Sequence, residues 1–214
     1  MKNQTKRLIA AIAFLTAFAV WTLLVLTVDV RKIGPLDSAV GFAGFNQFVH
    51  NAIGVNMLIY TVTDWLLVVP VLSALCFAVL GLIQLIRRKS LLKVDRSLIA
   101  LGVFYIAVIV AYLAFEVLSI NYRPVLIDGI LEASYPSTTT MVVMCVMLTA
   151  IIQIKLRIKN SKARRILIFS AELFASLMVI GRLLSGVHWV TDIIGSVLLS
   201  LGFVLLYAAF SKEK

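Results

Sequence analysis

The sequence contains only two cysteines and two histidines. Cys76 and Cys145 both fall within apolar stretches, where a thiol is typically a small apolar filler rather than half of a disulfide. His50 and His188 lie far apart, and no cysteine cluster accompanies either one, so the chain lacks the ligand spacing of a zinc site. The sequence therefore implies no metal and no cofactor.

Charged residues are also scarce. They make up 14% of the chain, against 62% hydrophobic residues and a mean hydropathy of +1.05. A soluble globule of this length needs more polar surface than that, so we expect an integral membrane protein. Stretches of the roughly 20 apolar residues that cross a bilayer lie at 8–28, 57–86, 97–120, 137–156, 165–187 and 189–210.

These stretches predict an all-α fold, an integral membrane six-helix bundle that forms a single domain over residues 1–214. The first stretch follows Lys2, Lys6 and Arg7, as in a signal peptide, but it is long and no small-residue cleavage site clearly follows it. We expect it to remain as a membrane anchor.

Acidic residues are half as frequent as basic ones, 10 against 20, which gives a net charge of +10. That charge alone is compatible with nucleic-acid binding, but its distribution indicates a membrane topology and no nucleic-acid partner. Four cations lie on one side of the predicted spans or at its margin: Arg31, Lys32, Arg123 and Arg182. The other sixteen lie on the opposite side, which the positive-inside rule assigns to the cytoplasm together with both termini. We expect a multi-pass protein of the cell (plasma or inner) membrane.

The segment 181–192 carries the main chemical signal. His188 lies four residues before Asp192 and six after Arg182. On a helix, residues four apart share a face, so Asp192 can accept a hydrogen bond from one imidazole nitrogen and leave the other free for attack. The guanidinium of Arg182 offers a planar set of donors suited to phosphate oxygens. The three residues together favour phosphoryl transfer over a proton relay.

A second signal lies around the predicted outer loop 121–136. Arg123 opens this loop, and Ser137, Thr138 and Thr139 follow Pro136 at the start of the next helix. A helix N-terminus with free N–H groups and hydroxyls binds anions, although the same residues often only cap the helix. Arg123, the hydroxyl residues and the 181–192 segment all fall at the outer ends of helices, which favours one common phosphate site.

The outer segment 29–56 contains Phe42, Phe45 and Phe48 at intervals of three residues. This spacing predicts a short helix along the membrane interface. Such a helix either covers the site and controls lipid access or simply anchors the segment, and both interpretations remain open.

The motifs resemble the type 2 phosphatidic acid phosphatase family of membrane lipid phosphatases, which is related to vanadium haloperoxidases. The third family motif is Ser-Arg-x5-His-x3-Asp, and the chain has Gly181-Arg182, five residues, His188, three residues, Asp192. The resemblance covers about 57–210, which we interpret as the phosphatase-like core.

Two other motifs of the family are present with departures. Lys-x6-Arg-Pro becomes Glu116, six residues, Arg123-Pro124, and Pro-Ser-Gly-His becomes Pro136-Ser137-Thr138-Thr139. Glu therefore replaces a lysine, and Thr replaces a histidine. The outer leaflet position of the motifs agrees with an active site that faces outward.

The resemblance implies a phosphohistidine mechanism at the outer face. His188 attacks the phosphorus, Asp192 orients it, and Arg123, Arg182 and the Ser137 to Thr139 segment bind the phosphate. The family histidine that protonates the leaving oxygen is Thr139 here, and threonine is no acid near neutral pH.

The loss of that acid favours a substrate with a weakly basic leaving group. A lipid diphosphate such as undecaprenyl diphosphate expels a phosphate monoester, whereas phosphatidic acid expels a strongly basic alkoxide. Glu116 is a further candidate catalytic residue. It supplies the missing proton if protonated, or else forms a structural ion pair with Arg123. His50 is a third possible acid, although a surface histidine is the simpler interpretation.

We therefore expect a membrane lipid phosphatase of the cell envelope that acts on a lipid diphosphate or monophosphate, with phosphorylated and membrane lipids as its partners. The alternative is a catalytically degenerate family member that binds or transports phosphorylated lipids. A third interpretation, a small solute transporter, uses Asp64, Glu116 and Glu172 as intramembrane charges, for which helix-to-helix pairing is the default role. It leaves the Arg-His-Asp spacing unexplained.

Overall fold

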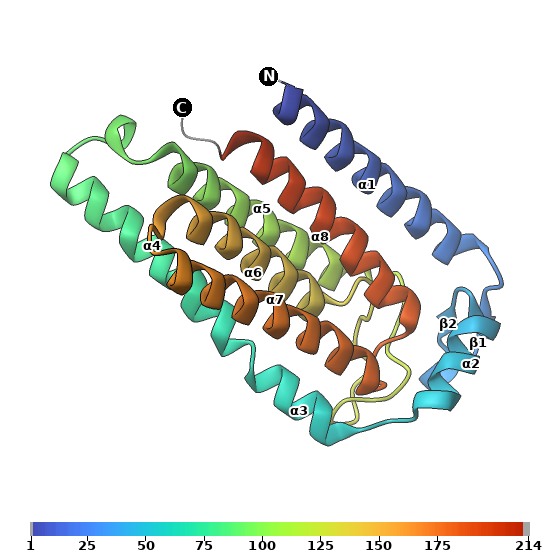
Figure 1. The fold of residues 1–214 in the computed structure, drawn as a ribbon. Coiled ribbons are helices and arrows are strands. Elements are labelled where there is room, and N and C mark those ends of the chain that lie inside the picture. Colours follow the sequence, from blue (N-terminus) through green and yellow to red (C-terminus); the bar gives the residue numbers. More distant parts are fainter. Residues whose placement is uncertain (1, 212–214) are drawn as a thin grey trace.

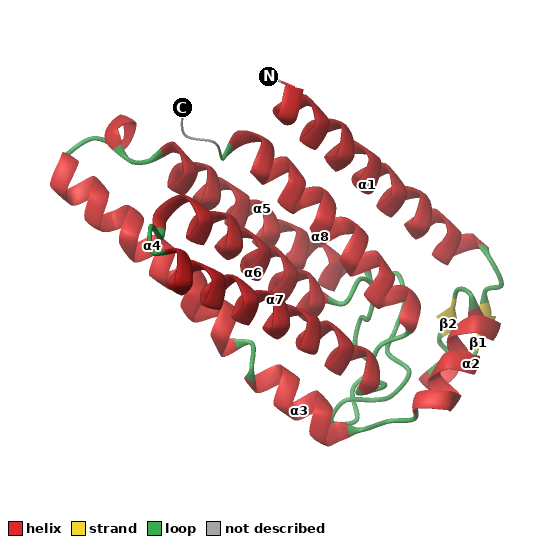
Figure 2. Ribbon diagram, in the orientation of Figure 1, coloured by secondary structure: helices red, strands yellow, loops and turns green. Residues whose placement is uncertain are grey.

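The computed structural model of the chain describes residues 2–211. The described part is almost entirely helical (Figure 2), and its α-helices are α1 (Lys2–Thr27), α2 (Ala43–Ile53), α3 (Met57–Trp65), α4 (Val68–Arg88), α5 (Arg96–Leu118), α6 (Thr138–Arg157), α7 (Ser161–Leu184) and α8 (Val190–Phe210). Its short elements are β1 (Arg31–Lys32), η1 (Pro35–Asp37), β2 (Ala39–Val40) and η2 (Leu91–Lys93).

The prediction of a six-helix membrane bundle is confirmed. Six segments of residues 2–211 are long and apolar enough to cross a membrane, and the second of them combines α3 and α4. These helices run roughly along one common direction, whereas α2 lies at one end of the bundle (Figure 1). The break between α3 and α4 falls at Leu66 and Leu67, and Pro70 follows in the first turn of α4, where its missing N–H costs nothing.

The core is centred on α6 and α8, which are the most buried of the six spans. Small residues allow this packing, because they let helix backbones approach each other closely. A Cβ at Gly202 of α8 would lie only 2.7 Å from Leu15 Cδ2 of α1, and Ser196 and Ser200 of α8 are fully buried. Met141 and Cys145 of α6 complete an apolar cluster with α5 and α8. Neither cysteine forms a disulfide, as predicted.

The start of α1, the end of α8 and the α4–α5 and α6–α7 connections lie at one end of the bundle, whereas the α5–α6 loop and the α7–α8 turn lie at the other (Figure 1). The basic residues that we assigned to the cytoplasmic side therefore gather at the end of the bundle opposite the candidate motifs. Lys212 and Lys214, which we also assigned to the basic side, lie outside the described residues. That this side is the cytoplasm stays a prediction.

The segment between α1 and α3 forms a small outer layer. β1 and β2 pair in an antiparallel register, and α2 follows. The predicted short helix is present, but Phe42 precedes it and stacks on Trp21, with ring centroids 5.2 Å apart. Phe45 and Phe48 are exposed. The three phenylalanines therefore do not line one side of the helix.

Candidate active site

The turn between α7 and α8 holds His188. Gly186 in this turn has a φ of +67°, a left-handed conformation that glycine adopts without strain. A Cβ at this position would also lie 1.9 Å from the carbonyl oxygen of Gly54, because the α2–α3 connection crosses the turn there. The N–H of Asn56 donates to the carbonyl of Ser185 at 2.9 Å and fixes this crossing. The backbone around His188 is therefore tightly constrained, and the His188 side chain is buried.

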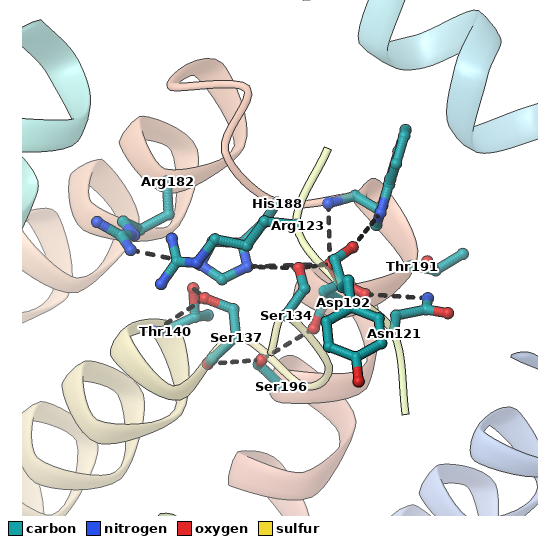
Figure 3. Close-up of polar contacts among 12 residues, drawn as sticks. Asn121, Arg123, Ser134, Ser137, Thr140, Arg182, His188, Thr191, Asp192 and Ser196 are labelled. Carbon is teal, nitrogen blue, oxygen red and sulfur yellow. Dashed lines mark hydrogen bonds and ion pairs between the residues drawn. The ribbon is translucent and has the colours of Figure 1, made fainter. Parts of the chain in front are cut away.

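His188 and Asp192 lie together, but not for the reason that their spacing suggested. His188 precedes α8, which begins at Val190, so the two residues do not share a helical face. Their nearest atoms, His188 Nδ1 and Asp192 Oδ2, are 3.8 Å apart. Ser134 of the α5–α6 loop fills the gap: its hydroxyl lies 3.1 Å from Nδ1 and donates to Asp192 Oδ2. Figure 3 shows this hydroxyl between the imidazole and the carboxylate.

This network fixes the protonation of the imidazole. Because the Ser134 hydroxyl gives its hydrogen to Asp192, its oxygen accepts from the Nδ1–H of His188. Nε2 then carries a lone pair, and it lies 3.3 Å from Nη2 of Arg182, which can donate to it. The free nitrogen of His188 therefore faces the arginines.

Asp192 is held rigidly in its own right. The backbone N–H of Trp189 donates to its Oδ2 at 2.9 Å, which caps the N-terminus of α8, and Asn121 Nδ2 lies 3.5 Å from its Oδ1. Its side chain is fully buried. The carboxylate thus has donors on both oxygens, and its position is set by α8 and by the α5–α6 loop.

Arg182 lies in the last turn of α7, and its side chain is only 1% exposed. Three groups of α3 surround its guanidinium. Its Cζ lies 4.9 Å from the Tyr60 ring centroid, and its Nη1 lies 3.4 Å from Thr63 Oγ1 and 3.8 Å from Asp64 Oδ1. Cation–π contact and a hydroxyl acceptor both favour one orientation of this guanidinium.

Arg123 reaches the same place from the α5–α6 loop. Its guanidinium lies on the Nε2 side of His188 together with that of Arg182 (Figure 3), and its Cζ is 5.8 Å from the Tyr60 ring centroid. Its Nε lies 3.0 Å from Glu132 Oε2. Within residues 2–211, Nε and Nη1 of Arg123 and Nε of Arg182 are buried and have no hydrogen-bond partner. Arg123 Nη1 and Arg182 Nε are thus buried donors without acceptors in the described part of the chain, whereas Arg123 Nε faces the Glu132 carboxylate.

The hydroxyl residues at the start of α6 act largely as a cap. Ser137 is the N-cap residue, with its oxygen 3.5 Å from the Thr140 N–H, and its own backbone N–H donates to the Asp192 carbonyl at 3.3 Å. Thr138 donates to Glu116 Oε1 at 3.2 Å, and Thr139 is buried in the first turn. The capping interpretation is therefore correct for Ser137, and the role of all three in phosphate binding stays a prediction.

The ion pair expected between Glu116 and Arg123 is wrong within the described residues, where Arg123 pairs with Glu132. The expectation assumed a continuous helix across these seven residues. Instead α5 ends at Leu118, and Ser119 turns the chain with a φ of +44°. Glu116 is exposed rather than directed into the bundle.

The other ionisable residues meet mixed outcomes. Asp64 is near Arg182, as helix-to-helix pairing requires, but Glu172 of α7 is exposed, so its expected interior position is wrong. His50 of α2 is half-buried, with its ring centroid 5.4 Å from that of Trp189. Among residues 2–211 no group of three or more His, Cys, Asp or Glu side chains has the arrangement of a metal site.

The electrostatics of the site keep His188 neutral. Burial, and then the positive charges of Arg123 and Arg182, lower its pKa well below the ordinary histidine value. A neutral imidazole retains the lone pair that a nucleophile needs. The same positive charge that lowers this pKa suits the binding of an anion at Nε2.

Several residues of the site escaped the sequence analysis. None of the motifs contains Ser134, Tyr60, Thr63 or Glu132. No spacing rule connects α3 or the α5–α6 loop to His188. Only the position of Ser134, two residues before Pro136, offered a signal. Such contacts depend on loop conformation, which local patterns do not determine.

Known proteins match both the sequence and the fold. The family model described as PAP2 superfamily matches residues 115–214. The resemblance to the PAP2 superfamily is thereby confirmed. The structure is also similar to that described as the first transmembrane PAP2 type phosphatidylglycerolphosphate phosphatase from Bacillus subtilis, with a TM-score of 0.61, 18% identity and 93% coverage of each chain. A comparison with curated proteins gives no match.

The PAP2 match has a structural meaning for the site. Its residues include every part of the His-Ser-Asp network and both arginines, whereas Tyr60, Thr63 and Asp64 lie before its first residue. The fold is that of a multi-pass PAP2-type membrane protein. The boundary of the phosphatase-like core at about residue 57 stays a prediction.

Proposed function

We propose that the chain is a membrane lipid phosphatase that transfers the terminal phosphate of a lipid diphosphate or monophosphate to His188 and then to water. The observation that carries this proposal is that two buried guanidinium donors, Arg123 Nη1 and Arg182 Nε, have no acceptor among the described residues, while Arg182 also lies against Nε2 of His188. A buried donor without a partner costs about 1–3 kcal/mol, more when charged. Phosphate oxygens supply the missing acceptors.

The chemical step uses the geometry of these groups. Nε2 attacks phosphorus, so that a P–N bond forms and the P–O bond to the leaving group breaks. Arg123 and Arg182 stabilise the charge that develops on the equatorial oxygens. The positive charge that forms on His188 is stabilised through Ser134 by the Asp192 carboxylate. Water then cleaves the P–N bond and regenerates the neutral imidazole.

The leaving group determines the favoured substrate. Thr139 replaces the family histidine, and Glu116 is exposed and accepts a hydrogen bond from Thr138. A diphosphate such as undecaprenyl diphosphate, on the outer leaflet, needs the least proton donation. Glu116 remains our candidate for the residual proton transfer that a monoester requires.

The alternative function is binding or transport of a phosphorylated lipid without turnover. The replacement of the family acid by Thr139 favours it, because a monoester would then bind without cleavage. Binding or transport alone does not require the hydrogen bonds by which Ser134 and Asp192 orient His188, so we favour the enzyme.

Phosphate release by purified protein tests the proposal. We expect the wild type to release inorganic phosphate from undecaprenyl diphosphate faster than from phosphatidic acid, and His188→Ala to release none. His50→Phe is the matched control, since it removes the other imidazole but keeps a ring against Trp189. Equal release by His188→Ala and wild type would remove the proposed nucleophile.

A second variant tests the leaving-group argument. Thr139→His restores an acid at the family position, and we expect it to raise release from phosphatidic acid more than from the diphosphate. Equal gains on both substrates, or none, would contradict the account of Thr139.

A further inference from the structure

Each of the two arginines has one carboxylate partner, and both carboxylates are far more exposed than the arginines. The Asp64 side chain is 53% exposed against 1% for Arg182, and the Glu132 side chain is 39% exposed against 11% for Arg123. The carboxylates are therefore accessible from outside, whereas the guanidiniums are not. They belong to different segments, α3 and the α5–α6 loop.

Neither ion pair contains a hydrogen bond of good geometry. Asp64 Oδ1 is 3.8 Å from Arg182 Nη1, beyond hydrogen-bond distance. Glu132 Oε2 is 3.0 Å from Arg123 Nε, yet that N–H has no hydrogen bond of acceptable geometry. Ion pairs with a partly exposed carboxylate contribute little to stability. A stronger and better placed anion can replace these carboxylates without disrupting the fold.

The guanidiniums keep other supports when the carboxylates are replaced. Tyr60 lies beneath both of them, and Thr63 accepts from Arg182. Thr63 is itself fixed, because its hydroxyl donates to the carbonyls of Ile59 and Tyr60 in its own helix. Asp64 and Glu132 are thus needed as charges rather than as the only groups that orient the arginines.

We propose that Asp64 and Glu132 are displaceable counter-ions that make the site select doubly charged terminal phosphates over the singly charged phosphodiesters of ordinary membrane lipids. A terminal phosphate carries about −1.5 to −2 charges near pH 7, whereas a phosphodiester carries only one. Displacing two carboxylates from two arginines therefore favours the terminal phosphate. The inference rests on the proposed function, because it concerns the substrate of that same site.

Binding of inorganic phosphate to the purified wild type and to Asp64→Asn and Glu132→Gln measures the effect without any turnover. Both variants keep the side-chain shape and remove one negative charge. We expect calorimetry to show about twofold to fivefold tighter binding in each, in line with one partly exposed charge. Kinetically, KM for the lipid substrate falls by a similar factor, whereas kcat stays the same or falls.

Asp128→Asn is the matched control. It makes the same charge change in the same loop, at an exposed residue whose φ of +50° asparagine tolerates, and it leaves phosphate affinity unchanged. Thermal unfolding verifies that all three variants remain folded. The selectivity itself is measured by phosphatidylglycerol in mixed micelles: it inhibits the double variant Asp64→Asn, Glu132→Gln and barely affects the wild type.

The inference and the proposed function fail in different ways. If Asp64→Asn and Glu132→Gln bind phosphate no more tightly than wild type, or if neither they nor the wild type bind it, the counter-ion role is overturned, even if the enzyme cleaves lipids. If both variants bind phosphate more tightly while no lipid releases phosphate, the counter-ion role stands and the proposed hydrolysis fails.

Discussion

Ser134 connects the proposed nucleophile to its carboxylate. Its hydroxyl lies 3.1 Å from His188 Nδ1 and donates to Asp192, whereas His188 and Asp192 themselves remain 3.8 Å apart. For histidines that bind a metal, the partners that orient the ring are typically worth 10- to 100-fold in affinity or activity, and we expect a similar scale for Ser134. Ser134 therefore replaces the direct contact that the His188–Asp192 spacing suggested.

We predict that Ser134→Ala lowers kcat by roughly 10- to 100-fold, because the link between His188 and Asp192 is lost. Steady-state phosphate release measures this. Ser170→Ala, on an exposed part of α7, is the control and keeps the wild-type rate. A kcat within twofold of wild type for Ser134→Ala would contradict the bridging role.

The neutral state of His188 predicts a pH dependence. Burial and the two arginines lower its pKa, so it stays unprotonated below pH 6.5, the value for a free histidine. We expect the limb of kcat/KM that reports His188 to lie below that pH. The unfolded chain binds this proton more readily, so the histidine's contribution to stability is fully present above about pH 6.5 and is lost as the pH falls.

Comparison of unfolding temperatures at pH 5 and pH 7 checks the sign. Wild type loses more stability on acidification than His188→Ala, which lacks the titrating group. A fall in kcat/KM on acidification with a midpoint at or above pH 6.5, which no other variant removes, would contradict the conclusion that His188 is buried and neutral.

At the scale of elements, the end of the bundle opposite the site is fastened by Asp95. This residue lies between α4 and α5 and accepts from Gln84 at 2.7 Å, from Arg88 at 2.9 Å and from Arg157 of α6 at 2.9 Å. Partial burial opposes its charge, but the hydrogen bonds from Gln84, Arg157 and Arg88 prevail and lower the pKa of Asp95 to about 2. One carboxylate thus joins the ends of three helices.

We predict that Asp95→Asn lowers the free energy of unfolding by about 2 kcal/mol, the scale of hydrogen bonds to a charged group. The measurement is thermal unfolding in detergent, with Asp128→Asn as the exposed control. Phosphate release at low temperature stays close to wild type, because the site lies at the other end of the bundle. Unfolding at the wild-type temperature would show that Asp95 does not fasten the helices.

The elements differ in how well the sequence predicts them. Long apolar runs predict all six spans, since only helices of that length satisfy their backbone within a bilayer. The break at Leu66 and Leu67 lies within the stretch 57–86, between Asp64 and Pro70, and hydropathy alone predicts one continuous helix there. The two-turn relation of Glu116 to Arg123 failed because α5 ends between them. Arg123, Arg182, His188 and Asp192 lie together, as their motifs suggested, whereas Glu116 does not join them and the partners in loops and in α3 were not predictable.

At the scale of the whole molecule, the distribution of charge predicts the orientation. The basic connections lie at one end and the site at the other, so the positive-inside rule places the site outside. This orientation agrees with a substrate in the outer leaflet. The orientation and the identity of the substrate are independent predictions and need separate tests.

Labelling of single cysteines on intact cells checks the orientation. In a background with Cys76→Ser and Cys145→Ala, we expect Asp128→Cys to react with a membrane-impermeant maleimide and Ser90→Cys to react only after the cells are opened. The reverse pattern would place the site on the cytoplasmic side.

The most direct test of the central claim is a search for phosphate bound to His188 during turnover. Purified protein is mixed with undecaprenyl diphosphate that carries a labelled terminal phosphate, quenched rapidly in alkali, and digested for mass spectrometry. We predict an acid-labile, alkali-stable label on the peptide that contains His188, absent from His188→Ala and present in His50→Phe. Steady release of phosphate by the wild type with no label on His188, or equal release by His188→Ala, would contradict the account.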